Sequence, residues 1–125
     1  MIVNIENAKI VNNKITILKD VNLTLHKGEF AYLIGKTGSG KSSLLKTLYG
    51  ELKLKKGSGK VCGFSLEKLR RSEIPYLRRK LGIVFQDFEL LMDRTVHENL
   101  HFVLKATGWK DKKKIEQRIK DVLEH

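Results

Sequence analysis

The chain has 125 residues, of which 41% are hydrophobic, so it can build a core and intrinsic disorder is excluded. Its 25 lysines and arginines against 14 acidic residues give a net charge of +11, which favours polyanionic ligands such as nucleotides, nucleic acid or an anionic membrane face. No apolar run approaches the roughly 18 residues of a spanning helix. The N-terminus lacks the layout of a secretory signal, and Cys62 is the single cysteine, which favours a cytosolic protein.

The first third of the chain has the pattern of β-structure. Apolar and polar residues alternate through residues 2–25, with a turn signal near Asn13, so we expect half-buried strands there. Residues 30–34 form a short continuous apolar run, which is typical of a strand covered on both faces. Tyr32 in this run is expected to be a core residue.

A glycine-rich loop follows this run at once. Residues 35–42 read Gly-Lys-Thr-Gly-Ser-Gly-Lys-Ser and match G-x-x-x-x-G-K-[ST] between an expected strand and an expected helix. Glycines let main-chain N–H groups approach phosphate oxygens, and the start of the helix adds its own free N–H groups. The ammonium group of Lys41 suits the β- and γ-phosphates, and the Ser42 hydroxyl suits Mg²⁺. The expected nucleotide-binding residues of the loop are Gly35, Lys36, Thr37, Gly38, Ser39, Gly40, Lys41 and Ser42.

Further elements are expected downstream of the loop. Leucines at helical spacing predict a helix over residues 41–50 that stops at Gly50, and a short strand is expected around Val61. Residues 72–80 are expected to be partly helical, and residues 81–86 form another buried strand. Thr95 with Glu98 is a capping-box pattern, so a helix is expected to begin there, and a last helix follows Asp111.

Three further segments carry a resemblance to a known family. Residues 77–86 (LRRKLGIVFQ) resemble the Q-loop strand of ABC-type ATPases, residues 95–100 (TVHENL) resemble the segment after it, and residues 18–23 (LKDVNL) are typical of the family before its glycine loop. The resemblance implies an α/β P-loop NTPase of the ABC ATPase type. We therefore expect a mixed sheet core with an N-terminal antiparallel β layer over residues 1–94, and the start of an incomplete helical subdomain over residues 95–125.

The resemblance also assigns residues and ligands. It implies ATP and Mg²⁺ as cofactors, with Gln86 as a Mg²⁺ ligand and as the residue that couples the nucleotide to a partner. Ser43 is expected at the α-phosphate. Val11 aligns with the aromatic residue on which the family stacks adenine, where an aliphatic contact is weaker than stacking.

Within the family, residues 74–79 (IPYLRR) with the Phe85 segment are similar to the bacterial cell-division ATPases, and ATPases of lipoprotein-release and macrolide-export systems are the alternative. This implies an integral membrane subunit as partner, a homodimer of the full-length protein, and a peripheral place on the inner face of the cell membrane. No specific nucleic-acid partner is expected.

Several elements of the family are missing from these residues. The signature motif, the strand that ends in Asp-Glu and the switch histidine are expected in sequence beyond His125. The full-length protein would be an ATPase, whereas no catalytic residue is expected within this chain, which should hydrolyse little ATP alone. The shortened helical layer should leave apolar surface uncovered, particularly Val96, Leu100, Ile115 and Ile119.

Two other classes of function compete with this interpretation. Residues 97–101 (HENLH) fit the zinc-protease motif H-E-x-x-H, although no convincing third ligand follows. Basic runs such as residues 53–60 and 110–114 could bind nucleic acid, but aromatic residues do not alternate with them as in a stacking platform. The same runs could lie near anionic headgroups beside a membrane partner.

Overall fold

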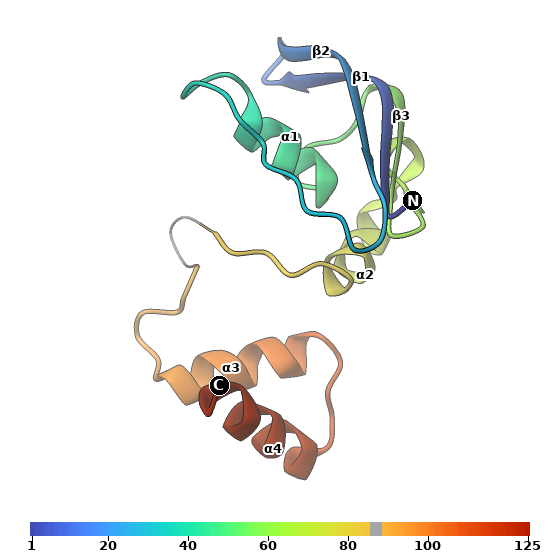
Figure 1. Ribbon diagram of the computed structural model, residues 1–125. Coiled ribbons are helices and arrows are strands. Elements are labelled where there is room, and N and C mark those ends of the chain that lie inside the picture. Colours follow the sequence, from blue (N-terminus) through green and yellow to red (C-terminus); the bar gives the residue numbers. More distant parts are fainter. Residues whose placement is uncertain (86–88) are drawn as a thin grey trace. The chain divides into compact units, whose positions relative to one another are not determined.

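The computed structural model describes residues 1–85 and 89–125. The chain forms two compact units, Met1–Gly82 and Ile83–His125 (Figure 1). Each unit is described by itself. The first holds the sheet and the glycine loop, and the second holds two helices.

The first unit is built on a four-stranded antiparallel sheet in the order β2-β1-β3-β4. The strands are β1 (Val3–Asn12), β2 (Ile15–Leu25), β3 (Lys56–Val61) and β4 (Phe64–Ser65). A two-residue turn joins β1 to β2, because Asn13 and Lys14 both have positive φ, as a hairpin turn that matches strand twist requires. The strands expected within residues 2–25 and around Val61 are thus confirmed.

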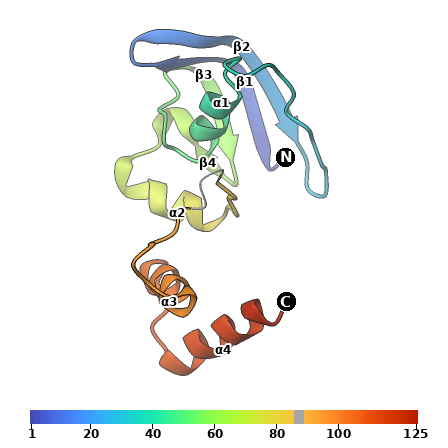
Figure 2. The same cartoon turned by 90° about the vertical axis from the view of Figure 1, so that its left-hand side faces the viewer.

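Helix α1 (Lys41–Leu48) packs on one face of this sheet (Figure 2). It buries Leu44 and Thr47 and ends where Gly50 has a φ of 83°, as the stop signal predicted. After β4 in the sequence, the chain forms two short 3₁₀ turns, η1 (Leu66–Lys68) and η2 (Arg71–Glu73), and then helix α2 (Ile74–Arg79). The partial helix expected over residues 72–80 is confirmed. The core of the unit joins sheet and helices through Val3, Ile5, Ala8, Leu54, Val61, Leu66 and Leu77.

The second unit pairs helix α3 (Val96–Ala106) with helix α4 (Lys112–Leu123). Both predicted caps are present: Thr95 and Glu98 form a full capping box, and the Asp111 carboxylate accepts hydrogen bonds from two first-turn amides of α4. The expectation of uncovered apolar surface is corrected for Ile115 and Ile119. Both are buried, because the pairing of α3 with α4 covers them. Val96 remains exposed and Leu100 is half-buried.

The two core strands expected beside the glycine loop are not formed in the described residues. Residues 30–34 and 81–85 have no strand structure, and Tyr32, expected in a core, is 82% exposed. Residue 86, the last of the second expected strand, lies outside the described residues. A strand exists only where a neighbour supplies hydrogen-bond partners, and within residues 1–85 and 89–125 no strand pairs with either segment. This part of the chain therefore forms the antiparallel β layer without the mixed core sheet.

Among the residues that the structure describes, no helix has both the length and the apolar composition needed to cross a membrane. This agrees with the sequence, in which the longest continuous apolar run expected to be structured covers only residues 30–34.

Candidate functional site: a phosphate-binding loop

The glycine loop lies exposed at the point where α1 begins. Residues 35–39 are exposed, Gly40 is the N-cap of α1, and Lys41 is its first residue. The loop contains one local turn, in which the amide of Ser39 donates to the carbonyl of Lys36 over 3.0 Å. The predicted order of loop and helix is confirmed, and the loop is open to a ligand.

The backbone conformation favours glycine at two positions of the loop, and at a third, Gly35, a Cβ would require the Ser39 hydroxyl to move. Gly38 and Gly40 have φ values of 83° and 100°, in the left-handed region that residues with a Cβ rarely adopt. A Cβ on Gly40 would also lie 2.8 Å from Ile17 Cγ2 in β2. A Cβ on Gly35 would lie 2.5 Å from Ser39 Oγ. Strand β2 thus restricts which residue can stand at position 40, in addition to the backbone conformation of the loop.

The start of α1 offers positive charge and unpaired donors. The first-turn amides of a helix have no partner inside it, and Gly40 has no side chain with which to cap them. No acidic residue lies in the first turn to oppose an incoming anion. The Lys41 ammonium group folds back over the loop and donates a hydrogen bond to the carbonyl oxygen of Gly35. These groups together offer positive charge and N–H donors to an anion at an exposed loop.

Two serines follow the lysine. The Ser42 side chain is exposed, and within the described part of the chain its hydroxyl has no hydrogen-bond partner. A free hydroxyl oxygen is a ligand that suits Mg²⁺, so this residue fits the expected metal. Ser43 is half-buried, and its carbonyl oxygen accepts a hydrogen bond from Thr47 Oγ1 over 2.8 Å.

The remaining two predicted site residues lie outside the loop. Val11 is a half-buried residue of β1 that pairs with Thr16 of β2, next to the Ile17 that approaches Gly40. The hairpin end of β1 and β2 therefore lies beside the loop (Figure 1). Gln86 lies outside the described residues.

The H-E-x-x-H residues have structural roles in α3. The Glu98 carboxylate accepts a hydrogen bond from the Thr95 amide over 3.2 Å, and this bond, with the Thr95 side chain, lowers the pKa of Glu98. His97 Nε2 lies 2.8 Å from Glu116 Oε2, and its ring stacks 6.1 Å from that of His101. In residues 1–85 and 89–125, no three His, Cys, Asp or Glu side chains gather as a metal site would require. The motif is explained by a capping box and an interhelical contact.

One residue of the basic runs has a role that the sequence did not reveal. Arg78 of α2 donates from Nε to the carbonyl oxygen of Tyr49 at the end of α1. The run of basic residues around it predicted only a solvated helix face. A basic residue near the end of another helix gives no signal in the sequence, because the two are 29 positions apart.

The sequence is similar to known proteins over most of its length. The sequence profile of the ABC transporter family matches residues 18–125. The cell division ATP-binding protein FtsE of Streptococcus pneumoniae serotype 2 is 40% identical over 117 residues, which cover 94% of this chain and 50% of that protein. FtsE of Bacillus subtilis is 40% identical over 119 residues, covering 95% and 52%. The methionine import ATP-binding protein MetN of Helicobacter pylori is 38% identical over 125 residues, covering 99% and 38%.

Solved structures of ATP-binding cassette proteins are similar to this chain. The ATP-binding cassette MJ0796, described as a dimer in a post-hydrolysis state with bound ADP and Pi, superposes with a TM-score of 0.83 at 29% identity, covering 98% of this chain and 56% of its own. The cbiO1 protein of Clostridium perfringens, part of the ABC transporter complex cbiONQ, superposes with a TM-score of 0.82 at 26% identity, covering 98% and 49%.

The fold and loop define an α/β P-loop protein of the ATP-binding cassette class. The chain belongs to the ABC transporter family. It spans about half the length of the FtsE proteins that it matches. The predicted family and fold class are confirmed.

Proposed function

We propose that this chain binds Mg²⁺-ATP through the loop of residues 35–43, as the nucleotide-binding part of an ATPase. The observation that carries the proposal is the arrangement at the start of α1, where Lys41 and uncapped first-turn amides face an exposed loop without an opposing acidic residue. Glycines at 38 and 40 leave the main chain free to approach phosphate oxygens.

Each residue has a separate part in this proposal. Lys41 neutralises the β- and γ-phosphates, Ser42 holds Mg²⁺ with Gln86, and Ser43 lies at the α-phosphate. The bound Mg²⁺ supplies charge neutralisation on the phosphates. Val11 contacts the base through aliphatic carbons. Gln86 also couples the nucleotide to the partner subunit.

For the whole protein we propose ATP hydrolysis by a homodimer. The dimeric cassette MJ0796 with bound ADP and Pi supports this assembly, because that protein shares the fold over 98% of this chain. The relatives are about twice as long as this chain. The apolar side chains of Phe30 and Ile34 are exposed here, whereas a continuous apolar run of this kind is typical of a strand covered on both faces.

We propose the cell-division type of this family, which regulates cell-wall remodelling through an integral membrane subunit, FtsX-like or a permease. The protein would then lie on the inner face of the cell membrane, bound to that subunit. The FtsE matches from several bacteria support this choice. The MetN match favours a second candidate, the ATPase of an import system, and it is of nearly equal identity. A further alternative to the cell-division type is the ATPase subunit of a lipoprotein-release or macrolide-export system.

Backbone amide NMR tests the binding proposal. Addition of Mg²⁺-ATP should shift the amide signals of residues 35–43 more than those of the distant strand β4. Signals of the loop that do not move at millimolar nucleotide would contradict it. The subtype is tested separately, by identifying the membrane protein that copurifies with the full-length ATPase from its native cell. A solute importer in place of a cell-division subunit would contradict that part.

A further inference from the structure

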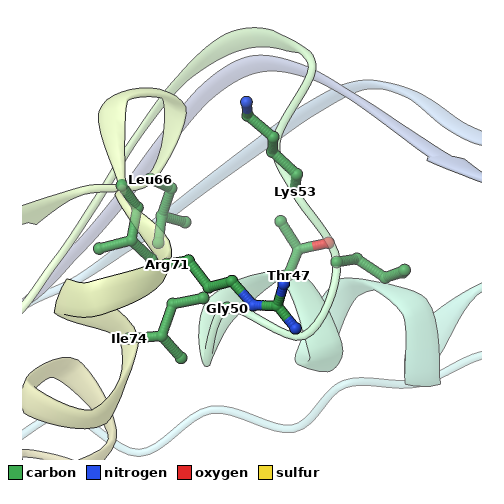
Figure 3. Close-up of a pocket in the computed structure, with 8 residues that line it drawn as sticks. Thr47, Gly50, Lys53, Leu66, Arg71 and Ile74 are labelled. Atoms are coloured by element: carbon green, nitrogen blue, oxygen red, sulfur yellow. The ribbon is translucent and has the colours of Figure 1, made fainter.

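A hollow lies at the opposite end of α1 from the glycine loop. It is a hollow of about 200 Å³ between the last turn of α1 and the segment of η1, η2 and α2 (Figure 3). Leu52, Leu66, Leu69 and Ile74 supply its aliphatic walls, Thr47 and Gly50 close the side formed by α1, and Lys53 and Arg71 complete the lining. Helix α1 has eight residues, so the hollow is separated from the phosphate-binding loop by about 12 Å of helix.

One cation points into this hollow. Figure 3 shows the Arg71 side chain crossing from η2 toward α1, with its guanidinium group on the α1 side, whereas the ammonium group of Lys53 points away from α1. Among the residues that the structure describes, the exposed Arg71 side chain has no hydrogen-bond or ion-pair partner. The side chains of two nearby arginines, in contrast, have partners. Arg70 pairs with Glu73 over 3.7 Å, and Arg78 bonds to the Tyr49 carbonyl.

The other polar group in the hollow does not compete with Arg71 for an anion. Thr47 is 2% exposed, and its hydroxyl donates to the Ser43 carbonyl over 2.8 Å. Its hydrogen is therefore not free to bind an acceptor. Lys53 also lines the hollow, but its ammonium group points away from α1. The guanidinium group is therefore the side-chain donor on the α1 side, and it presents N–H groups in the forked geometry that matches a carboxylate.

We propose that this hollow binds a small organic carboxylate with a compact apolar body. The carboxylate would pair with Arg71, and the apolar body would lie against Leu52, Leu66, Leu69 and Ile74. The size fits, because an apolar cavity of about 150 Å³ is enough to hold benzene. The site is separate from the proposed nucleotide site and does not depend on it.

Titration of the chain with benzoate, followed by the amide signals of Gly50 and Leu69, tests this inference. Benzoate should bind with saturable shifts, and benzamide, which has the same shape without the charge, should bind at least about tenfold more weakly. Arg71→Gln should weaken benzoate binding by about tenfold or more, the size expected for the loss of a charge-assisted hydrogen bond. Far-UV circular dichroism of the variant checks that it folds.

Two matched variants remove a positive charge from the same region. Arg70→Gln and Lys53→Gln should change benzoate affinity by less than about twofold, since Arg70 does not line the hollow and pairs with Glu73, and the Lys53 ammonium group points away from α1. The proposal is overturned if benzoate causes no saturable shift, if benzamide binds equally well, or if the control variants lose as much affinity as Arg71→Gln. The result for nucleotide binding has no bearing on these outcomes.

Discussion

Arg78 Nε donates a hydrogen bond to the main-chain oxygen of Tyr49 over 3.0 Å, and its guanidinium group lies 5.7 Å from the centre of the Tyr49 ring. Tyr49 is the C-cap of α1, where carbonyl groups have no partner inside the helix. The arginine therefore ties α2 to the end of the helix that begins at the glycine loop. The positive charge also lies at the negative end of the dipole of α1.

Replacing Arg78 should destabilise the first unit. Arg78→Ala removes a charge-assisted hydrogen bond and a cation–π contact, and we expect a loss of about 1 to 2 kcal/mol in the free energy of unfolding. Urea denaturation measures this change. Arg70→Ala is the control, because its exposed pair with Glu73 at 3.7 Å contributes little. Equal denaturation midpoints for the two variants would contradict the role given to Arg78.

Replacing Gly40 by alanine should lower the free energy of unfolding more than the same change at Gly28, a glycine that also has a positive φ but has open space around it. Gly28 has a φ of 84° and space for a methyl group, with no atom within 4 Å of where a Cβ would lie, whereas a Cβ on Gly40 would meet Ile17 and Leu18 at 2.8 and 2.9 Å. Gly28→Ala should lower the free energy of unfolding by about 1 to 2 kcal/mol, from backbone strain alone. Gly40→Ala should lose more than this and should also weaken nucleotide binding. Thermal denaturation compares the two variants, and an equal shift in Tm would show that the contact with β2 has no effect.

The start of α3 should weaken in acid. The hydrogen bond from the Thr95 amide lowers the pKa of Glu98, so its ionised form favours the folded state. The stabilisation is present above the ordinary pKa of glutamate, about 4.3. It is lost as the pH falls through the lower pKa of the folded state. Hydrogen exchange of the first-turn amides of α3 measures it. In the Glu98→Gln variant, the exchange protection of these amides should no longer depend on pH in this range. If the pH dependence is unchanged in this variant, a group other than Glu98 causes it.

The base should be recognised weakly. Val11 presents aliphatic carbons beside the loop, and the stacking of a base on an aromatic side chain contributes about 1–3 kcal/mol that valine does not provide. We expect ATP and GTP to bind with affinities within about tenfold of each other. Val11→Tyr should strengthen ATP binding by about fivefold or more. Competition binding with a fluorescent nucleotide measures both effects, and a parent chain that already selects ATP over GTP by about a hundredfold would contradict the assignment of Val11.

The parts of the fold that depend on neighbouring residues in the sequence could be predicted, and those that depend on distant partners could not. Alternation predicted β1 and β2, and Thr95 with Glu98 predicted the start of α3 because a capping box is complete within four residues. The apolar run at residues 30–34 predicted a strand, but strand structure also requires a partner. Ile115 was expected to be uncovered and is buried by α3, a pairing that periodicity alone does not reveal.

The same distinction applies to the site. The residue types and spacing of the loop predicted where α1 begins, but not that Gly38 and Gly40 have left-handed backbone while Gly35 does not. The contact of Gly40 with Ile17 and the bond of Arg78 to Tyr49 join residues far apart in the sequence. Neither contact could be found from spacing. The shape of the loop is therefore set by β2 as well as by the motif itself.

Calorimetric titration with Mg²⁺ and a non-hydrolysable ATP analogue tests the central claim most directly. The parent chain should bind the analogue, and Lys41→Ala should weaken binding by at least about tenfold, because a close charge pair contributes more than any neutral group of the loop. Lys36→Ala, which removes an exposed lysine from the same loop, should weaken binding less. A parent chain that binds no nucleotide, or a Lys41→Ala variant that binds as tightly as the parent, would contradict the account.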